Sequence, residues 1–145
     1  QMLQAFACKD MLDAKRVMHL GLDLITMTTS RVTTPLTGRV VLSQNEQGAG
    51  QFGGLLVLES NFRGQTLYLL FGHLDPALLP KLGQTILQGE TLGQLGKPDV
   101  NGGWLEHLHF QLMTEEGYKA GFANLGYGKI QDINKYVLDP VLVLQ

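Results

Sequence analysis

The chain has 145 residues, of which 44% are hydrophobic and 17% are charged, and its formal net charge is −2. This length suits one domain that buries enough surface to fold without a disulfide or a structural metal. The composition excludes an intrinsically disordered chain, and the charge leaves no basic footprint for nucleic acid. Glycine contributes 18 residues, well above the usual share of about 7%. Because glycine disfavours helices and serves turns, we expect a β-dominated protein.

The N-terminal half alternates apolar segments with glycine-rich turns. Residues 10–17 are compatible with a short helix or an irregular lead-in, and the single cysteine, Cys8, permits no internal disulfide and is expected to be inert. Residues 44–54 are polar and rich in glycine, and predict a loop. Turn-forming residues at 61–64 connect two strongly apolar runs, which predicts a hairpin. The strands expected in this half are residues 38–43, 55–59 and 66–71.

The C-terminal half continues this pattern. Four glycines divide residues 81–96 into short β-prone pieces, and residues 97–103 predict a loop. Residues 107–113 predict a strand with alternating faces, and residues 117–135 form a polar and aromatic excursion. Residues 137–144 predict an edge strand or extended tail, because Pro140 interrupts any ladder. The whole chain predicts one all-β domain without a membrane span, since no apolar run approaches the roughly 20 residues that a spanning helix needs.

The four histidines occur in spacings that suit a metal site. His107 and His109 are two residues apart on a predicted strand, so both imidazoles leave the same face. His19 and Asp23 are four residues apart in a segment that we expect to be extended, and they also share a face. His73 follows a predicted strand and a glycine. Each residue alone is compatible with a structural role, but two imidazoles and one carboxylate with an open fourth position form a known catalytic zinc arrangement.

These motifs resemble those of the lysostaphin-type (LytM-type) zinc endopeptidases, which hydrolyse peptide bonds in bacterial cell-wall peptidoglycan. The family pattern is H-x-x-x-D, then a G-H-L-like segment, then H-x-H. In this sequence the three motifs are residues 19–23, 72–74 and 107–109. The resemblance covers about residues 16–113. It implies a single metallopeptidase-like domain over residues 1–145, folded as an antiparallel β-sandwich or barrel-sandwich hybrid with a groove across the main sheet.

The resemblance also implies a role for each matched residue. His19, Asp23 and His109 would bind one Zn²⁺ per chain, and His107 and His73 would lie beside the metal without binding it. Zinc lowers the pKa of a bound water toward roughly 7 and polarises the scissile carbonyl. His107 would take the proton of the water and return it to the leaving amine. His73 would donate a hydrogen bond to the oxyanion of the tetrahedral intermediate.

Some positions depart from the family pattern. The tyrosine that often stands two residues before the middle histidine is Phe71, and the usual proline before H-x-H is Glu106. Glu106 is either uninvolved, an extra ligand or a group that orients a ligand. Two further residues lie in the preceding glycine-rich loop. Asn101 either forms hydrogen bonds to the substrate backbone or belongs to a turn. Trp104 either forms a wall of the substrate groove or is an aromatic that caps the core. The candidate substrate-groove residues are Phe71, Asn101 and Trp104.

Three functions remain open at this point. The first is a zinc peptidase acting on peptidoglycan. The second is a zinc hydrolase acting on a small amide or peptide within a longer multidomain chain. This is suggested because residues 99–104 resemble a metallopeptidase-like module of long bacterial polypeptides that also carry a kinase-like domain and a pyridoxal-phosphate aminotransferase. The third is a phosphocarrier-like β module, which the carboxylate of Asp23 disfavours. A signal peptide upstream would imply a periplasmic or secreted protein, and a fusion module would imply a cytoplasmic one.

Overall fold

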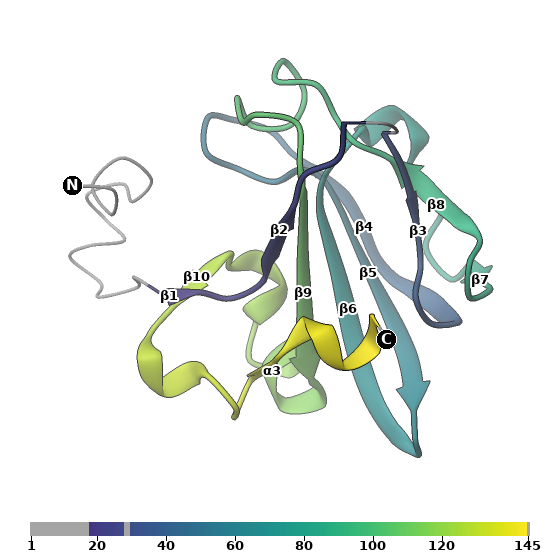
Figure 1. Ribbon diagram of the computed structural model, residues 1–145, viewed down its shortest axis with the longest axis vertical. Helices are drawn as coiled ribbons and strands as arrows, with labels where there is room; N and C mark the ends of the chain where they lie inside the picture. Colours follow the sequence, from purple (N-terminus) through teal and green to yellow (C-terminus); the bar gives the residue numbers. More distant parts are fainter. Residues whose placement is uncertain (1–17, 28–29, 145) are drawn as a thin grey trace.

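The structure is a computed structural model that describes residues 18–27 and 30–144 (Figure 1). An antiparallel sheet of seven strands forms its centre, and one of them is the short strand β2 (Leu22–Leu24). The helix expected within residues 10–17 and the cysteine Cys8 lie outside the described residues. The other strands are, in spatial order, β11 (Val137–Leu138), β9 (Leu108–Thr114), β6 (Gln65–Leu74), β5 (Gly53–Phe62), β4 (Gly38–Glu46) and β7 (Thr85–Ile86); β2 pairs with β9.

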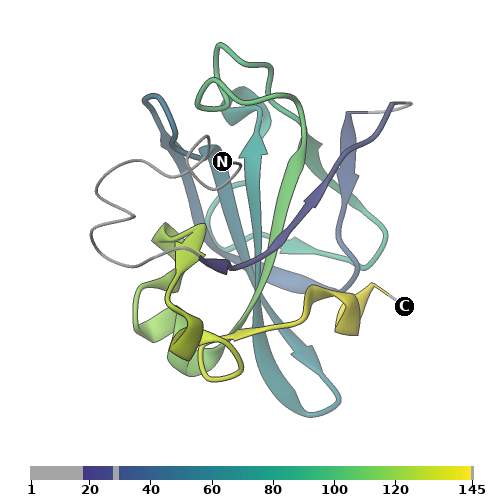
Figure 2. The same cartoon turned by 60° about the vertical axis from the view of Figure 1, so that its left-hand side comes forward.

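Two small sheets and a few short helices complete the fold. The strand β1 (Met18–His19) pairs with β10 (Tyr127–Gly128), and β3 (Arg31–Thr33) pairs with β8 (Thr91–Gln94). Figure 1 shows β3, β7 and β8 on one side of the central strands, and β1 and β10 on the other; Figure 2 gives a second view of the same arrangement. The helical segments are α3 (Glu115–Lys119) and the 3₁₀ helices η1 (Pro76–Leu78), η2 (Phe122–Asn124), η3 (Ile130–Asp132) and η4 (Pro140–Val143).

The central strands β5 and β6 are apolar along almost their whole length because both faces of the sheet are covered. Leu56 and Leu58 of β5 belong to a core cluster that includes residues of β3 and β8. Leu55 and Val57, which point the other way, belong to a second cluster with Phe122 and residues near the C-terminus. The β-dominated, antiparallel sandwich expected from the sequence is therefore confirmed.

Several element boundaries differ from the expected ones for local reasons. The loop expected at residues 44–54 is shorter, because Gln44 and Asn45 continue the ladder of β4 opposite β5. The excursion expected at residues 117–135 contains secondary structure of its own, including part of α3, whose N-terminus is capped by the Thr114 hydroxyl accepting from the Gly117 N–H. The expected C-terminal strand is only β11, after which Asp139 and Pro140 begin η4.

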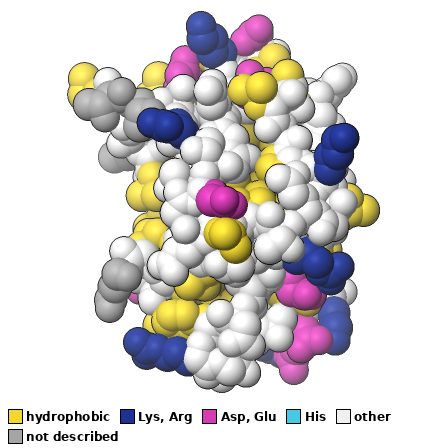
Figure 3. Space-filling view, turned by 90° about the vertical axis from the view of Figure 1, so that its right-hand side faces the viewer, with side chains coloured by type: hydrophobic (Ala, Val, Ile, Leu, Met, Phe, Trp, Pro, Cys, Tyr) yellow, Lys and Arg dark blue, Asp and Glu magenta, His cyan; other side chains and the backbone are white. Residues whose placement is uncertain are grey.

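The face over β3 and β8 has a surface of mixed character. Figure 3 shows hydrophobic, basic and acidic side chains mixed across it, and no histidine is visible among the described residues of this view. The alternation of side chains along a strand explains this: His109 lies on β9 between Leu108 and Phe110, which point into the cluster on the β3 side. The histidines therefore belong to the opposite face of the sheet.

On that opposite face, Tyr68 of β6 connects α3 to the sheet. Its hydroxyl donates to Glu59 Oε2 at 2.9 Å, and its ring stacks on Tyr118 with 4.2 Å between the ring centroids. Burial, together with the hydrogen bond to Glu59 and the negative charge of that carboxylate, raises the pKa of Tyr68 to about 12. The folded protein therefore keeps this proton at a pH where the unfolded chain releases it.

We expect the free energy of unfolding to fall as the pH rises from about 10 to about 12, because deprotonation of Tyr68 then favours the unfolded chain. Tyr68→Phe removes this contribution, so its stability should depend less on pH over the same interval. Urea unfolding of both proteins, at about pH 8 and about pH 11, measures the difference. The same alkaline loss in both proteins would show that Tyr68 does not cause it.

Candidate metal centre

Three side chains converge on one point beside β2 and β9. Asp23 lies directly across from His109 in the β2–β9 ladder, so both side chains leave the same face of the sheet. His19, at the end of β1, reaches the same point. His19 Nε2 is 3.1 Å from His109 Nδ1, and each of these nitrogens is 3.3 Å from Asp23 Oδ1.

The spacing of these three donor atoms fits a zinc ion. Tetrahedral zinc with bonds of about 2.0–2.1 Å holds its ligand atoms roughly 3.3–3.4 Å apart, which is close to the triangle observed here. Two imidazole nitrogens and one carboxylate oxygen are ligands that zinc accepts, and they leave a fourth position open. The residues present therefore fit the metal that the motifs predict.

The electrostatics of Asp23 agree with a ligand role. Burial opposes ionisation of this carboxyl, but hydrogen bonds from His109 and His19 and the charges of both rings outweigh burial. Together they hold the pKa of Asp23 well below its usual range. The carboxylate is thus ionised at neutral pH, as a metal ligand must be.

Gly21 makes this convergence possible. The extended chain is interrupted between the strands β1 and β2 at this residue, and the backbone of Gly21 lies against the ring of His109. A Cβ atom at this position would be 2.5 Å from the carbonyl oxygen of Phe110 and 3.0 Å from His109 Nε2. Only glycine therefore fits inside the H-x-x-x-D motif without displacing His109.

Two further imidazoles border the triangle. His107 Nε2 is 3.6 Å from Asp23 Oδ1, and the ring centroids of His107 and His73 are 4.5 Å apart. The Nδ1 atom of His107 lies 2.6 Å from the carbonyl oxygen of Leu105, and that of His73 lies 3.0 Å from the carbonyl oxygen of Asn101. Because a carbonyl oxygen only accepts, each Nδ1 carries a proton, and Nε2 of each neutral ring is a hydrogen-bond acceptor.

The backbone of His73 is held in an unusual conformation. Its φ is 65°, at an irregularity where β6 has one more residue than β5. The His73 N–H donates to the Phe52 carbonyl, and the His73 carbonyl accepts from the Gly96 N–H. Burial and, to a smaller extent, the neighbouring His107 lower the pKa of His73 to about 4. A neutral His73 has no N–H at Nε2 to offer an oxyanion, which changes the role expected for it.

Of the three candidate groove residues, Trp104 is the one beside the imidazoles. Its ring centroid is 5.9 Å from that of His73, and its indole N–H donates to the Gln51 carbonyl at 3.1 Å. The expectation that Phe71 lines a groove is wrong, because its side chain is 1% exposed and packs against Phe110 in the core on the other face.

The structure also corrects the expected role of the Asn101 side chain. This residue is fully buried, and its amide nitrogen donates to the carbonyls of Gly96 and Trp104. Its amide oxygen accepts from the Trp104 N–H. The side chain therefore organises its own loop and is not free for substrate. Glu106 is exposed, and it is not one of the described residues whose donor atoms converge.

Three residues close to the triangle were not among the candidate site residues. Phe52 packs its ring against His109, with 5.3 Å between centroids. Gln111 Oε1 lies 3.1 Å from His109 Nε2, and its place two residues after His109 on one strand was a signal that could have identified it. The Tyr127 ring is 5.1 Å from that of His19. Tyr127 reaches the site through the β1–β10 pairing, which its sequence neighbourhood does not predict.

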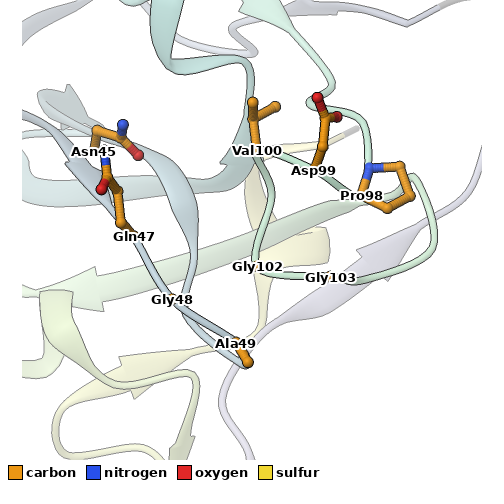
Figure 4. Close-up of a pocket in the computed structure, with 9 residues that line it drawn as sticks. All are labelled: Asn45, Gln47, Gly48, Ala49, Pro98, Asp99, Val100, Gly102 and Gly103. Atoms are coloured by element: carbon orange, nitrogen blue, oxygen red, sulfur yellow. The ribbon is translucent and has the colours of Figure 1, made fainter.

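A cavity of about 510 Å³ lies near the site but does not contain it. Figure 4 shows it between the β4–β5 turn and the loop that follows residue 97. None of the four histidines lines it, and neither does Asp23. Its lining residues are Asn45, Gln47, Gly48, Ala49, Pro98, Asp99, Val100, Gly102 and Gly103.

Comparison with known proteins agrees with this geometry. An antiparallel β fold that brings together two histidines and an aspartate, with two further imidazoles beside them, is typical of a metal-dependent hydrolase. The model of peptidase family M23 matches residues 17–120, which include all five of these side chains. The chain therefore belongs to peptidase family M23, and the family resemblance read from its motifs is confirmed.

Solved structures show the same fold at low sequence identity. The catalytic domain of the antimicrobial peptidase lysostaphin from Staphylococcus simulans is 21% identical, with 88% of this chain and 80% of that chain covered and a TM-score of 0.60. The structure of cbpa from L. salivarius REN is 22% identical, with coverages of 89% and 75% and a TM-score of 0.63. LytU is 24% identical, with coverages of 84% and 69% and a TM-score of 0.55.

No curated protein matches the chain. Within the described residues, the helices are too short and too polar to cross a lipid bilayer.

We expect Gly21→Ala to lower zinc affinity and stability, because the new methyl group would collide with the Phe110 carbonyl and the His109 ring. Gly93→Ala is the matched control, since the nearest atom to a Cβ there is Leu74 Cδ1 at an ordinary 3.8 Å. Chelator competition and thermal unfolding of the two variants provide the comparison. Equal zinc affinity in both would mean that the backbone at Gly21 does not position His109.

Proposed function

We propose that this protein is a zinc-dependent metallopeptidase that hydrolyses peptide bonds in bacterial peptidoglycan. The observation that carries the proposal is the triangle of His19, Asp23 and His109 donor atoms, 3.1 to 3.3 Å apart, beside two imidazoles whose Nδ1 atoms face backbone carbonyls. Membership of peptidase family M23 supports peptide-bond hydrolysis. The similar fold of lysostaphin, described as an antimicrobial peptidase, supports a bacterial wall substrate.

In this proposal His19, Asp23 and His109 hold one zinc ion per chain. When bound, the ion would lower the pKa of a water molecule and polarise the carbonyl of the scissile bond. His19 contributes Nε2 and His109 contributes Nδ1, while Asp23 supplies the one negative charge of the set. His109 is 2% exposed, so this side of the site is closed to solvent, whereas the Asp23 side chain is 44% exposed and leaves the site open there.

His107 is the proposed general base. Its Nε2 is an acceptor because its Nδ1 proton is held by the Leu105 carbonyl, and the Asp23 carboxylate 3.6 Å away stabilises the imidazolium that forms. His107 takes one proton from the attacking water. It returns this proton to the amine nitrogen as the carbon–nitrogen bond breaks, which leaves an amine and a carboxylic acid; the second proton of the water then passes from the acid to the amine, so that the products are a carboxylate and an ammonium group.

His73 has a different proposed role from the one that the resemblance implies. Its neutral ring, held by the Asn101 carbonyl and by burial, presents an acceptor to the reaction. It therefore accepts a hydrogen bond from the attacking water or from the amide N–H of the substrate and so orients that group. Trp104, beside His73, forms an aromatic wall for the bound peptide. An enzyme that cuts peptidoglycan, as proposed here, acts at the bacterial cell envelope, where that substrate is located.

We expect purified protein to bind close to one zinc per chain. His109→Ala should lose the metal, because it removes a ligand and leaves Asp23 without its buried partner. His107→Ala should keep the metal but lose at least about 100-fold in turnover, as expected for loss of a general base. Elemental analysis and peptide hydrolysis measure the two quantities. If His107→Ala loses zinc as readily as His109→Ala, the assignment of these two roles is wrong.

The substrate is tested separately. We expect the zinc-loaded protein to release soluble muropeptides from purified peptidoglycan, and His107→Ala loaded with zinc to release none. Chromatography of the soluble fraction with mass analysis identifies the bond that is cut. If the zinc-loaded protein releases no muropeptides yet hydrolyses small amides or peptides, the metallopeptidase part of the proposal survives and the wall substrate is wrong.

A further inference from the structure

Gln111 is a fully buried polar residue whose amide has two defined partners. It lies on β9 two residues after His109, so the two side chains share a face of the sheet. Its Nε2 donates to the carbonyl oxygen of Phe122 at 3.1 Å, and its Oε1 lies 3.1 Å from His109 Nε2. Because the Phe122 carbonyl only accepts, the amide nitrogen must face Phe122 and the amide oxygen must face His109.

This orientation gives the two nitrogens of His109 different partners. An amide oxygen accepts, so a proton on Nε2 donates to Gln111. Nδ1 faces Asp23 and His19, and it is the nitrogen that could bind a metal. The hydrogen bond at Nε2 therefore fixes the direction in which Nδ1 points.

The partner of Gln111 belongs to a segment just beyond the family match, which ends at residue 120. Residues 122–127, here called the bracing segment, make two more contacts around the triangle. The Gly126 carbonyl accepts from the Leu20 N–H, next to His19, and a Cβ on Gly126 would lie 3.7 Å from His109 Cε1. Tyr127 pairs with His19 across β1 and β10, and their rings meet edge to face.

We propose that Gln111 is a positioning residue that holds the His109 ring with Nδ1 toward the donor triangle, and that the bracing segment is a working part of the metal centre. Through Gln111 the segment holds one imidazole ligand, and through Tyr127 it holds the other. The inference rests on the proposed function, because it concerns the same metal. The inference adds that residues 122–127, which lie outside the family-matched region, affect the affinity of the site for zinc.

Two substitutions at Gln111 test the first part. Gln111→Met keeps the size of the side chain but removes the acceptor, and it should weaken zinc binding by about 10-fold to 100-fold, the usual effect of losing a group that orients a ligand. Gln111→Glu keeps an oxygen that accepts from His109 Nε2 and should restore most of that affinity. Competition with a chromogenic chelator measures affinity, and circular dichroism of the zinc-free proteins checks the fold. Equal weakening by Met and Glu, or none by Met, overturns the positioning role.

These affinities also separate the positioning role from the proposed function. If the natural protein binds no zinc, the proposed function fails. If the natural protein binds zinc and Gln111→Met binds it equally well, the proposed function stands and the positioning role fails.

The Tyr127 contact is tested against a matched tyrosine. Tyr127→Leu should weaken zinc binding by about tenfold, because His19 loses the ring that packs against it. Tyr118→Leu removes a tyrosine that stacks on Tyr68, away from the metal, and should leave zinc affinity unchanged even where it lowers stability. Equal zinc affinities in the two variants would overturn the role of the bracing segment at His19.

Discussion

The site depends on the register between β2 and β9. Asp23 and His109 are direct partners in this ladder, so two donors are placed on one face by backbone hydrogen bonds alone. A shift of β2 by one residue would turn Asp23 to the other face and leave His109 buried without its carboxylate. Gly21 permits this register, because the chain lies so close to His109 that a larger residue would push the strands apart. The third donor, His19, then needs only a short break in the strand to reach the same point.

The backbone of His73, on the neighbouring strand β6, is strained, and this strained conformation directs its side chain. A left-handed φ at a residue with a Cβ costs roughly 1–2 kcal/mol, and His73 adopts it at the irregularity of β6. Backbone hydrogen bonds to Phe52 and Gly96 hold the residue on both sides. The irregularity turns the His73 imidazole toward His107. In a regular strand, side chains would keep alternating between the two faces, and His73 would share a face with Phe71. Strain of this kind is found mainly where function requires a particular side-chain direction.

The sequence was sufficient to predict the β-dominated fold and the residues that form the donor triangle. The fold followed from the glycine content and the short apolar runs, and strand alternation placed His107 with His109 and His19 with Asp23. The choice of His19, Asp23 and His109 as the three donors followed from the resemblance to the lysostaphin-type endopeptidases. Phe71 was assigned wrongly because its neighbourhood in the sequence, two residues before His73, does not show that its side chain points to the other face of β6. The irregularity after Phe71 is what separates these two directions.

Protonation of the imidazoles was beyond the reach of sequence for a related reason. The carbonyl that fixes His73 comes from Asn101, and the amide that fixes His109 depends on Phe122. Hydrogen-bond partners so far apart in the chain leave no periodic pattern, although they decide whether each ring donates or accepts. The residue types of the site were therefore predictable, whereas their proton positions required the three-dimensional arrangement.

The pairing of β1 with β10 joins residues 18–19 to residues 127–128, and it has a consequence for biosynthesis. Since a polypeptide emerges from the ribosome N-terminus first, His19 and Asp23 are made long before the strand that braces them. The nascent chain therefore cannot complete the surroundings of the candidate metal centre until residues 127–128 have been synthesised. Contacts between such distant segments also form slowly, because a long loop must close before they contribute. The fold thus delays assembly of the complete site until translation has passed β10.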